Sequence, residues 1–174
     1  MHRRWISLKA IALIGPPQGG KSTLAFSFSK FLEKKGLRVG VANMGESAKA
    51  LKYAPFWDVR NKKQRKQDVF KTAKAEGLDF VLLDYTAPFD SFFFSKEIPL
   101  EKCDCVLLVF EAGSASHEDA QALAKALEER LEKKVVPVEN KSELSKSRLS
   151  FPSEVVSVSA WEKMGFEKLF SEIA

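Results

Sequence analysis

The sequence predicts an α/β fold in which helices cover both faces of a mostly parallel sheet. Short apolar runs, which are typical of buried strands, alternate along the chain with longer segments of helical periodicity. Only Leu37 and Arg38 separate the first expected helix from the next apolar run, which favours a parallel return to the sheet. A glycine-rich segment, Gly15–Ser22, lies between the first apolar run and that helix. These features predict three layers within a single domain over residues 1–174.

The first half of the chain is expected to form strands 10–14, 39–42 and 80–83 and helices 22–35 and 60–76. Helix 22–35 carries an apolar stripe that includes Leu24 and Phe28, and it ends in two lysines followed by Gly36, a typical helix C-terminus. Helix 60–76 is expected from the apolar stripe around Val69 and closes at Gly77.

The second half is expected to form strands 106–110, 135–138 and 155–158 and helices 116–133 and 162–173. Ser116 is the expected N-cap of helix 116–133, whose first turn is acidic and whose last turn is basic. Pro137 predicts reduced pairing on one side of its strand. The phenylalanine-rich loop 85–94 is either a mobile, partner-binding surface or a part of the core edge, and both interpretations stay open.

The segment Gly15–Ser22 matches the phosphate-binding P-loop pattern of Gly, four residues and Gly-Lys-Ser. With a strand before it and a helix after it, the pattern refines the fold class to a three-layer P-loop NTPase sandwich. Lys21 is expected to bridge the outer phosphates, and the Ser22 hydroxyl to bind Mg²⁺. Asp84, directly after an apolar strand, is the Walker B candidate that holds the ion through water, and with Lys21 it is a catalytic candidate. The residues expected around the phosphates are Gly15, Gln18, Gly19, Gly20, Lys21, Ser22 and Thr23.

Two further polar motifs follow late strands, at the sheet edge where nucleotide bases bind in folds of this type. They are Asn140-Lys141-Ser142-Glu143 and Ser159-Ala160. At these motifs the chain resembles the P-loop GTPases, in which Asn-Lys-x-Asp reads guanine and Ser-Ala supports it. The resemblance implies a base site made of Asn140, Lys141, Glu143, Ser159 and Ala160, with Glu143 in the aspartate position. A carboxylate there accepts two hydrogen bonds from guanine that adenine cannot offer.

The short connection before strand 39–42 further resembles the SIMIBI class, which includes metallochaperone-type GTPases and MinD/ParA-like ATPases. With the base motif, which favours GTP, the chain is expected to be a nucleotide switch that uses Mg²⁺ and GTP, and slow hydrolysis is expected because a residue that orients the attacking water is missing. ATP is the alternative, although Pro16 stands where the MinD/ParA-like loop carries a lysine. No glutamine or histidine follows Asp84 to orient the attacking water. Glu46 and Asp90 are the candidates for that role, and a protein partner or second subunit is the other source.

Three alternatives to the GTPase interpretation stay open. A MinD/ParA-like protein would bind ATP and act as a dimer, a small-molecule kinase would need an acceptor pocket beside the phosphates, and an interaction module would lack turnover. The basic segment 60–74 could contact nucleic acid or an anionic membrane, but a solvated helix face is the favoured interpretation.

The composition excludes several classes of protein. With 45% hydrophobic and 29% charged residues, the chain is neither disordered nor fibrous, and no apolar stretch approaches the ~20 residues of a membrane span. Cys103 and Cys105 stand two residues apart, poorly placed to bond to each other, so a reducing cytoplasm is the expected location. Packing in the core is the favoured role of these cysteines, and a shared metal ion is the alternative.

Overall fold

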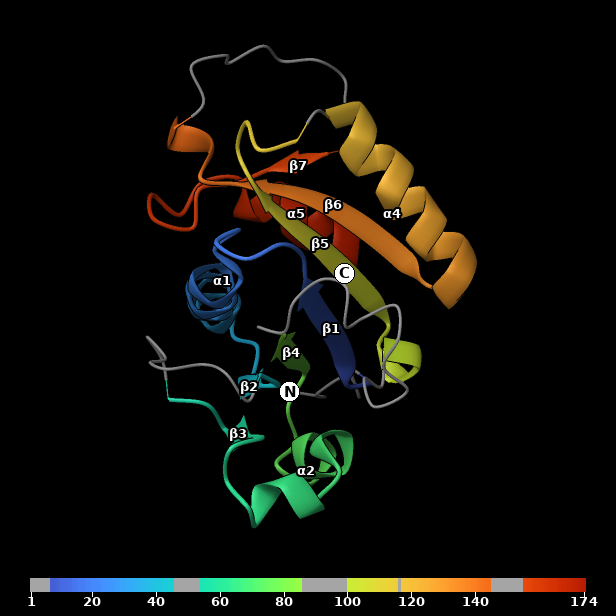
Figure 1. Cartoon of the computed structure of the whole chain (residues 1–174). Coiled ribbons are helices and arrows are strands. Elements are labelled where there is room, and N and C mark those ends of the chain that lie inside the picture. The colour runs from blue at the N-terminus through green and yellow to red at the C-terminus, as the bar shows by residue number, and fades with distance from the viewer. Residues whose placement is uncertain (1–6, 46–53, 86–99, 116, 145–154) are drawn as a thin grey trace.

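The computed structural model describes residues 7–45, 54–85, 100–115, 117–144 and 155–174. In this part of the chain a seven-stranded sheet has the order β3-β2-β4-β1-β5-β6-β7, and all its pairings are parallel. Figure 1 shows the strands stacked from β7 at the top to β3 at the bottom. The strands are β1 (Lys9–Ile14), β2 (Val39–Asn43), β3 (Trp57–Asp58), β4 (Phe80–Asp84), β5 (Cys105–Glu111), β6 (Lys134–Asn140) and β7 (Val156–Ser157).

Helices pack on both faces of this sheet, which confirms the predicted layers. The α-helices are α1 (Lys21–Lys34), α2 (Val69–Ala75), α4 (His117–Leu131) and α5 (Phe166–Ile173), and short 3₁₀ turns are η1 (Gln64–Lys66), η2 (Leu100–Lys102) and η3 (Ser142–Leu144). One core cluster contains buried residues of α1 and α5, and the other contains residues of α2 and α4. None of the described helices is long and apolar enough to cross a bilayer.

Strand β1 shows why its apolar run has no period-two alternation of polar residues. Ile11 and Leu13 enter the cluster beneath α1 and α5, whereas Ala10, Ala12 and Ile14 enter the cluster beneath α2 and α4. Both faces of a central parallel strand are buried, so every position from 10 to 14 is apolar.

Phenylalanine rings connect α1 and α5, which pack on the same face of the sheet. The ring of Phe166 in α5 lies edge-on to Phe28 and Phe31 in α1, with centroids 5.5 and 5.6 Å apart. Phe28 and Phe166 are almost fully buried. The first and last helices of the chain therefore pack against each other on the same face of the sheet.

Several expected elements differ from the structure. The strand β3 was not predicted, because only Trp57 and Asp58 form it. The expected helix 60–76 is wrong over its first half: Asp68 caps α2 by accepting hydrogen bonds from Phe70 N and Lys71 N, and only η1 precedes it. The last helix starts later than expected, at Phe166, because residues Ser159 and Met164 form an antiparallel bridge. Ser116 and most of the loop 85–94 lie outside the described residues.

Candidate nucleotide-binding site

The segment between β1 and α1 forms a glycine loop that rests on the backbone of β5. Gly15 and Gly20 have φ angles of 140° and 80°, which L side chains rarely adopt. A Cβ on Gly15 would collide with the Val109 carbonyl oxygen, and a Cβ on Gly19 would lie 2.9 Å from that same oxygen. These positions therefore require glycine because the loop touches a neighbouring strand.

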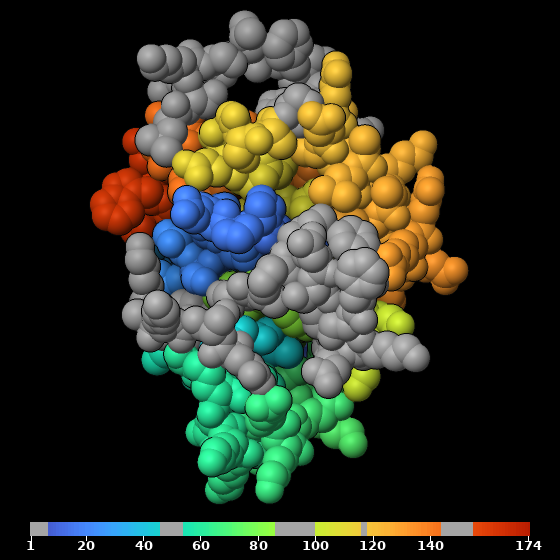
Figure 2. All heavy atoms as spheres, in the orientation of Figure 1, coloured from blue at the N-terminus to red at the C-terminus, as the bar shows by residue number. Residues whose placement is uncertain are grey.

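The N-terminus of α1 is open toward this loop. Gly20 is the N-cap, no side chain caps the helix, and its first turn contains no acidic residue. The first N–H groups of a helix have no partner within the helix and carry the positive end of its dipole, so this end suits a phosphate. In Figure 2 the blue loop reaches the molecular surface beneath the yellow segment that follows β5.

Lys21 and Asp84 share the electrostatic environment of the loop. The Lys21 ammonium donates hydrogen bonds to the carbonyl oxygens of Gly15 at 3.0 Å and Pro16 at 2.8 Å. Burial lowers the pKa of Lys21, and the negative charge of Asp84 opposes that shift. Asp84 is fully buried at the end of β4, paired in register with Leu13 of β1. The structure thus brings the two catalytic candidates together at the phosphate loop.

The oxygen ligands proposed for Mg²⁺ come from the segments around the same loop. Ser22 is the second residue of α1, and Asp84 ends the strand next to β1. A hydroxyl and a carboxylate are hard oxygen ligands of the type that Mg²⁺ prefers, and glycines leave the loop open beside them. The residues present therefore fit a magnesium–phosphate group.

Asn140 joins the phosphate loop to the expected base site. Its Nδ2 donates to the carbonyl oxygen of Gly19 at 3.0 Å and to that of Gly20 at 3.4 Å. Its Oδ1 accepts a hydrogen bond from Ala160 N at 3.1 Å. The side chain is buried, and it holds three segments together at the end of β6.

The other residues of the expected base site surround this brace. Lys141 has a φ of 62°, and its Nζ pairs with Glu111 Oε2 at 3.1 Å. The Oγ of buried Ser159 accepts a hydrogen bond from Glu162 N at 3.0 Å. Glu143 is exposed in η3, so its carboxylate is accessible to a ligand. The Ala160 N–H donates to Asn140 Oδ1, so a bound base would share this donor with Asn140.

Comparisons with known proteins agree with this geometry. No protein-family model and no curated protein matches the sequence. Among solved structures, a GTPase in apo form from Pyrococcus abyssi, PAB0955, aligns with a TM-score of 0.73 and 18% identity, covering 95% of this chain and 96% of that one. The chain therefore shares the overall fold of this GTPase structure. A LAO/AO transport system kinase aligns with a TM-score of 0.60 and 19% identity, over 95% of this chain and 58% of the kinase.

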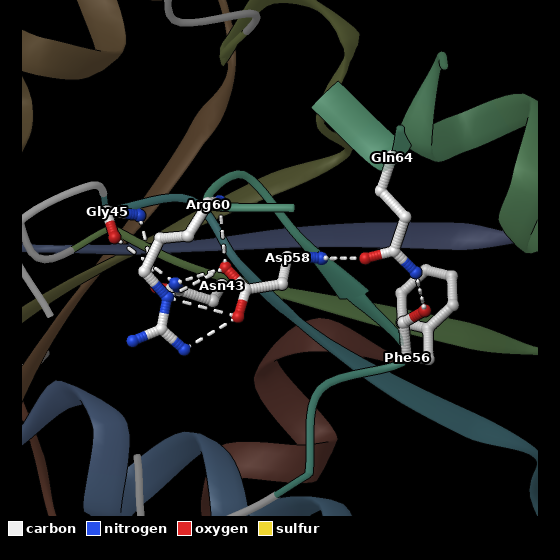
Figure 3. A network of polar contacts seen from close by, with 6 residues as sticks. All are labelled: Asn43, Gly45, Phe56, Asp58, Arg60 and Gln64. Carbon is white, nitrogen blue, oxygen red and sulfur yellow. Dashed lines mark hydrogen bonds and ion pairs between the residues drawn. The ribbon is translucent and has the colours of Figure 1, made fainter. Parts of the chain in front are cut away.

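The sequence did not predict a polar cluster on the β3 side of the glycine loop. It consists of Asn43, Asp58 and Arg60, which lie at the ends of β2 and β3 (Figure 3). Arg60 was expected at the start of a helix and as one of several solvated cations. The available signal was the change from apolar Phe56 and Trp57 to Asp58, which marks the carboxyl end of a short strand.

The two cysteines pack into the core on opposite faces of the sheet. Cys105 belongs to the cluster beneath α1 and α5, and Cys103 to the cluster beneath α2 and α4. Burial raises the pKa of Cys103 to about 12 and that of Cys105 to about 11, which favours the neutral thiol. Among the described residues no group of three or more His, Cys, Asp or Glu could hold a metal ion. The favoured packing role fits both positions.

Proposed function

We propose that this protein is a nucleotide switch that binds Mg²⁺ and GTP and hydrolyses GTP slowly. The observation that carries the proposal is the Asn140 brace, which ties the phosphate loop at Gly19 to the Ser-Ala segment at Ala160. The glycine loop and the Asn140 motif, whose bonded residues Gly19 and Asn140 are 121 residues apart in sequence, would thereby form one continuous edge, with a phosphate cradle at one end and Glu143 at the other.

Positive charge dominates the phosphate end of the site, because the first turn of α1 contains no acidic side chain. The open N-terminus of α1 and the Lys21 ammonium both face the loop. Lys21 is held by two carbonyl oxygens, and a phosphate would offer it a stronger, charge-assisted hydrogen bond. Bound Mg²⁺, held by Ser22 and through water by Asp84, would neutralise phosphate charge. The chain itself would position the phosphates, and the glycines of the loop would leave room for them.

The base end favours guanine through Glu143. Its exposed carboxylate stands on η3, one turn after the Asn140 brace, and would accept two hydrogen bonds from guanine. Lys141 lies next to Gly20 of the loop, so its aliphatic stem would cover one face of the base. Glutamate is longer than aspartate by one methylene, so the backbone at Glu143 would lie farther from the base than the backbone of an aspartate would.

Slow hydrolysis follows from the residues around Asp84. Phosphoryl transfer requires positioned water as well as charge neutralisation. The candidates for orienting water within this chain, Glu46 and Asp90, lie outside the described residues. No glutamine or histidine directly follows Asp84 in the sequence, so Glu46 or Asp90, a protein partner or a second copy of the chain would orient the water, and intrinsic turnover would be low. A location in the cytoplasm and a single domain over residues 1–174 are part of this proposal.

Titration of the nucleotide-stripped protein with fluorescent GTP and ATP analogues in Mg²⁺ tests the proposal. GTP is expected to bind more tightly than ATP. Lys21→Ala is expected to weaken both nucleotides by roughly tenfold or more, because it removes a charged hydrogen-bond donor. Glu143→Ala is expected to remove the preference for GTP and to leave ATP affinity unchanged.

Matched controls come from α4, which packs on the opposite face of the sheet from α1. Lys125→Ala and Glu129→Ala remove the same charges from exposed helical positions and are expected to leave both affinities within about twofold. Equal binding of ATP and GTP that Glu143→Ala does not change would replace the GTP switch with the ATP-binding alternative. Failure of either nucleotide to bind would overturn the proposal altogether.

A further inference from the structure

Three polar residues stand side by side where three neighbouring strands end. Asp84 of β4 pairs in register with Asn43 of β2, and Asn43 pairs with Asp58 of β3. Adjacent strands lie about 4.8 Å apart, so Asp58 is roughly 10 Å from Asp84 along this edge. The row therefore extends from the Walker B carboxylate away from the base site, on the side where a nucleotide's terminal phosphate would lie.

Asn43 couples the members of this row. It is fully buried, and its Nδ2 donates to Asp58 Oδ1 at 2.9 Å and to the carbonyl oxygen of Gly45 at 3.1 Å. Its Oδ1 accepts a hydrogen bond from Gly45 N at 3.1 Å. The next residue, Met44, donates its backbone N–H to the Asp84 carbonyl oxygen at 3.0 Å. The position of Asp58 is thus fixed relative to the end of β4.

Asp58 in turn orients the guanidinium of Arg60. Arg60 Nη2 lies 2.6 Å from Asp58 Oδ2, and Arg60 Nε lies 3.0 and 3.1 Å from the two carboxylate oxygens. The hydrogen bond from Arg60 lowers the pKa of Asp58 to about 2, so the pair is ionic at neutral pH. Figure 3 shows the guanidinium on the Gly45 side of Asp58, with Gln64 and Phe56 on the opposite side.

The turn after β3 also has hydrogen bonds that do not involve this guanidinium. Asp58 Oδ1 already accepts hydrogen bonds from the backbone N–H of Arg60 at 2.9 Å and from Asn43 Nδ2. The Arg60 side chain remains about one third exposed, at 34%. A guanidinium has five N–H donors in a fixed fork, so the edge formed by Nε and Nη2 can stay on a carboxylate while the group also meets a phosphate.

We propose that Arg60 contacts the terminal phosphate of a bound nucleoside triphosphate, with Asp58 as its positioning residue. This inference rests on the proposed function, which places Mg²⁺ and the phosphates between Lys21 and Asp84. Lys21 serves both di- and triphosphates from within the loop, whereas Arg60 approaches from the β3 side and reaches the last phosphate alone. Arg60 therefore makes the site distinguish a triphosphate from a diphosphate.

The test compares affinities for GDP and for a non-hydrolysable GTP analogue in Mg²⁺. Arg60→Ala is expected to weaken the triphosphate analogue by roughly tenfold, the loss of one charged hydrogen-bond contact, and to leave GDP within about threefold. Arg60→Lys keeps the charge but loses the fork, and an intermediate affinity for the analogue is expected. Lys62→Ala removes the same charge from an exposed neighbouring position, and both affinities are expected to change little and equally.

GDP affinity also serves as the folding control, because it requires an intact phosphate loop. If Arg60→Ala weakens GDP and the analogue equally, or weakens neither, the inference is overturned while nucleotide binding by the wild-type protein stands. If Lys62→Ala reproduces the selective loss, the effect is one of general charge and the inference is again overturned. If the wild-type protein binds neither nucleotide, the proposed function falls and this inference falls with it.

Discussion

Replacement of Asn140 by alanine should destabilise the protein even when no nucleotide is present. The substitution removes the donor to Gly19 O and the acceptor of Ala160 N, and both of these contacts are buried. A buried polar group left without a partner costs about 1–3 kcal/mol, so the loss of two partners predicts a decrease of about 2–6 kcal/mol in the free energy of unfolding. For a chain of this size the melting temperature should fall by roughly 4–24 °C.

Urea unfolding of the nucleotide-free protein measures this cost directly. The m-value of Asn140→Ala should match that of the wild type, because the folded and unfolded surfaces are nearly the same. Gln67→Ala removes an exposed amide and should change stability by no more than about 0.5 kcal/mol. A residue that only contacted the base would be silent in this assay. An Asn140→Ala variant as stable as Gln67→Ala would therefore refute the role of Asn140 as a brace between the two motifs.

Three further predictions follow from packing and titration. Phe166→Ala removes a buried ring that contacts Phe28, and it should lower the free energy of unfolding by about 3–5 kcal/mol in urea titrations; a loss below about 1 kcal/mol would contradict the packing. Folding lowers the pKa of Asp58 from 3.8 to about 2. The ionised carboxylate therefore stabilises the folded protein fully above pH 3.8, and this stabilisation is lost as the pH falls toward 2. The stability difference between wild type and Asp58→Asn should therefore narrow from about pH 5 to about pH 2, and a constant difference would count against the ion pair. Buried thiols of raised pKa should make Cys103 and Cys105 unreactive toward a disulfide reagent in the native protein, with both reacting in guanidinium chloride; rapid reaction of the native protein would argue against their burial.

The fold was largely predictable because its signals are local. Buried parallel strands require continuous apolar runs, as in β4 and β5, and the glycine pattern of the phosphate loop needs strand and helix at fixed positions on either side. The sequence-based bounds of β1 and β2 differ from the structure by a single residue at one end.

The elements that failed depend on contacts between distant residues. Strand β3 exists because Trp57 and Asp58 pair with the end of β2, and two residues carry no periodicity. The basic residues after it favoured one long helix, but the Asp68 side chain caps a shorter helix and so fixes its start. Propensity alone could not choose between these two arrangements.

The candidate site was predicted as two motifs, and the structure adds how they are joined. Asn140 was expected to read the base, yet its hydrogen bonds connect Gly19 and Ala160, which are far apart in sequence. Nor did the pattern connect Arg60 with Asp84, because their relation passes through strand pairing and through Asn43. Motif patterns specify residue types, whereas such connections emerge only from the register of the sheet.

Strand β5 contacts both ends of the candidate site. The Val109 carbonyl oxygen touches the loop at Gly15 and Gly19, and Glu111 of the same strand binds Lys141 at the base end. Two residues of an extended strand span about 6.8 Å, so both ends of the site take their position from one short, stiff length of backbone. Because Val109 and Glu111 belong to the same strand, a movement of β5 would carry the glycine loop and Lys141 along together, and the distance between these two parts of the candidate site would be kept.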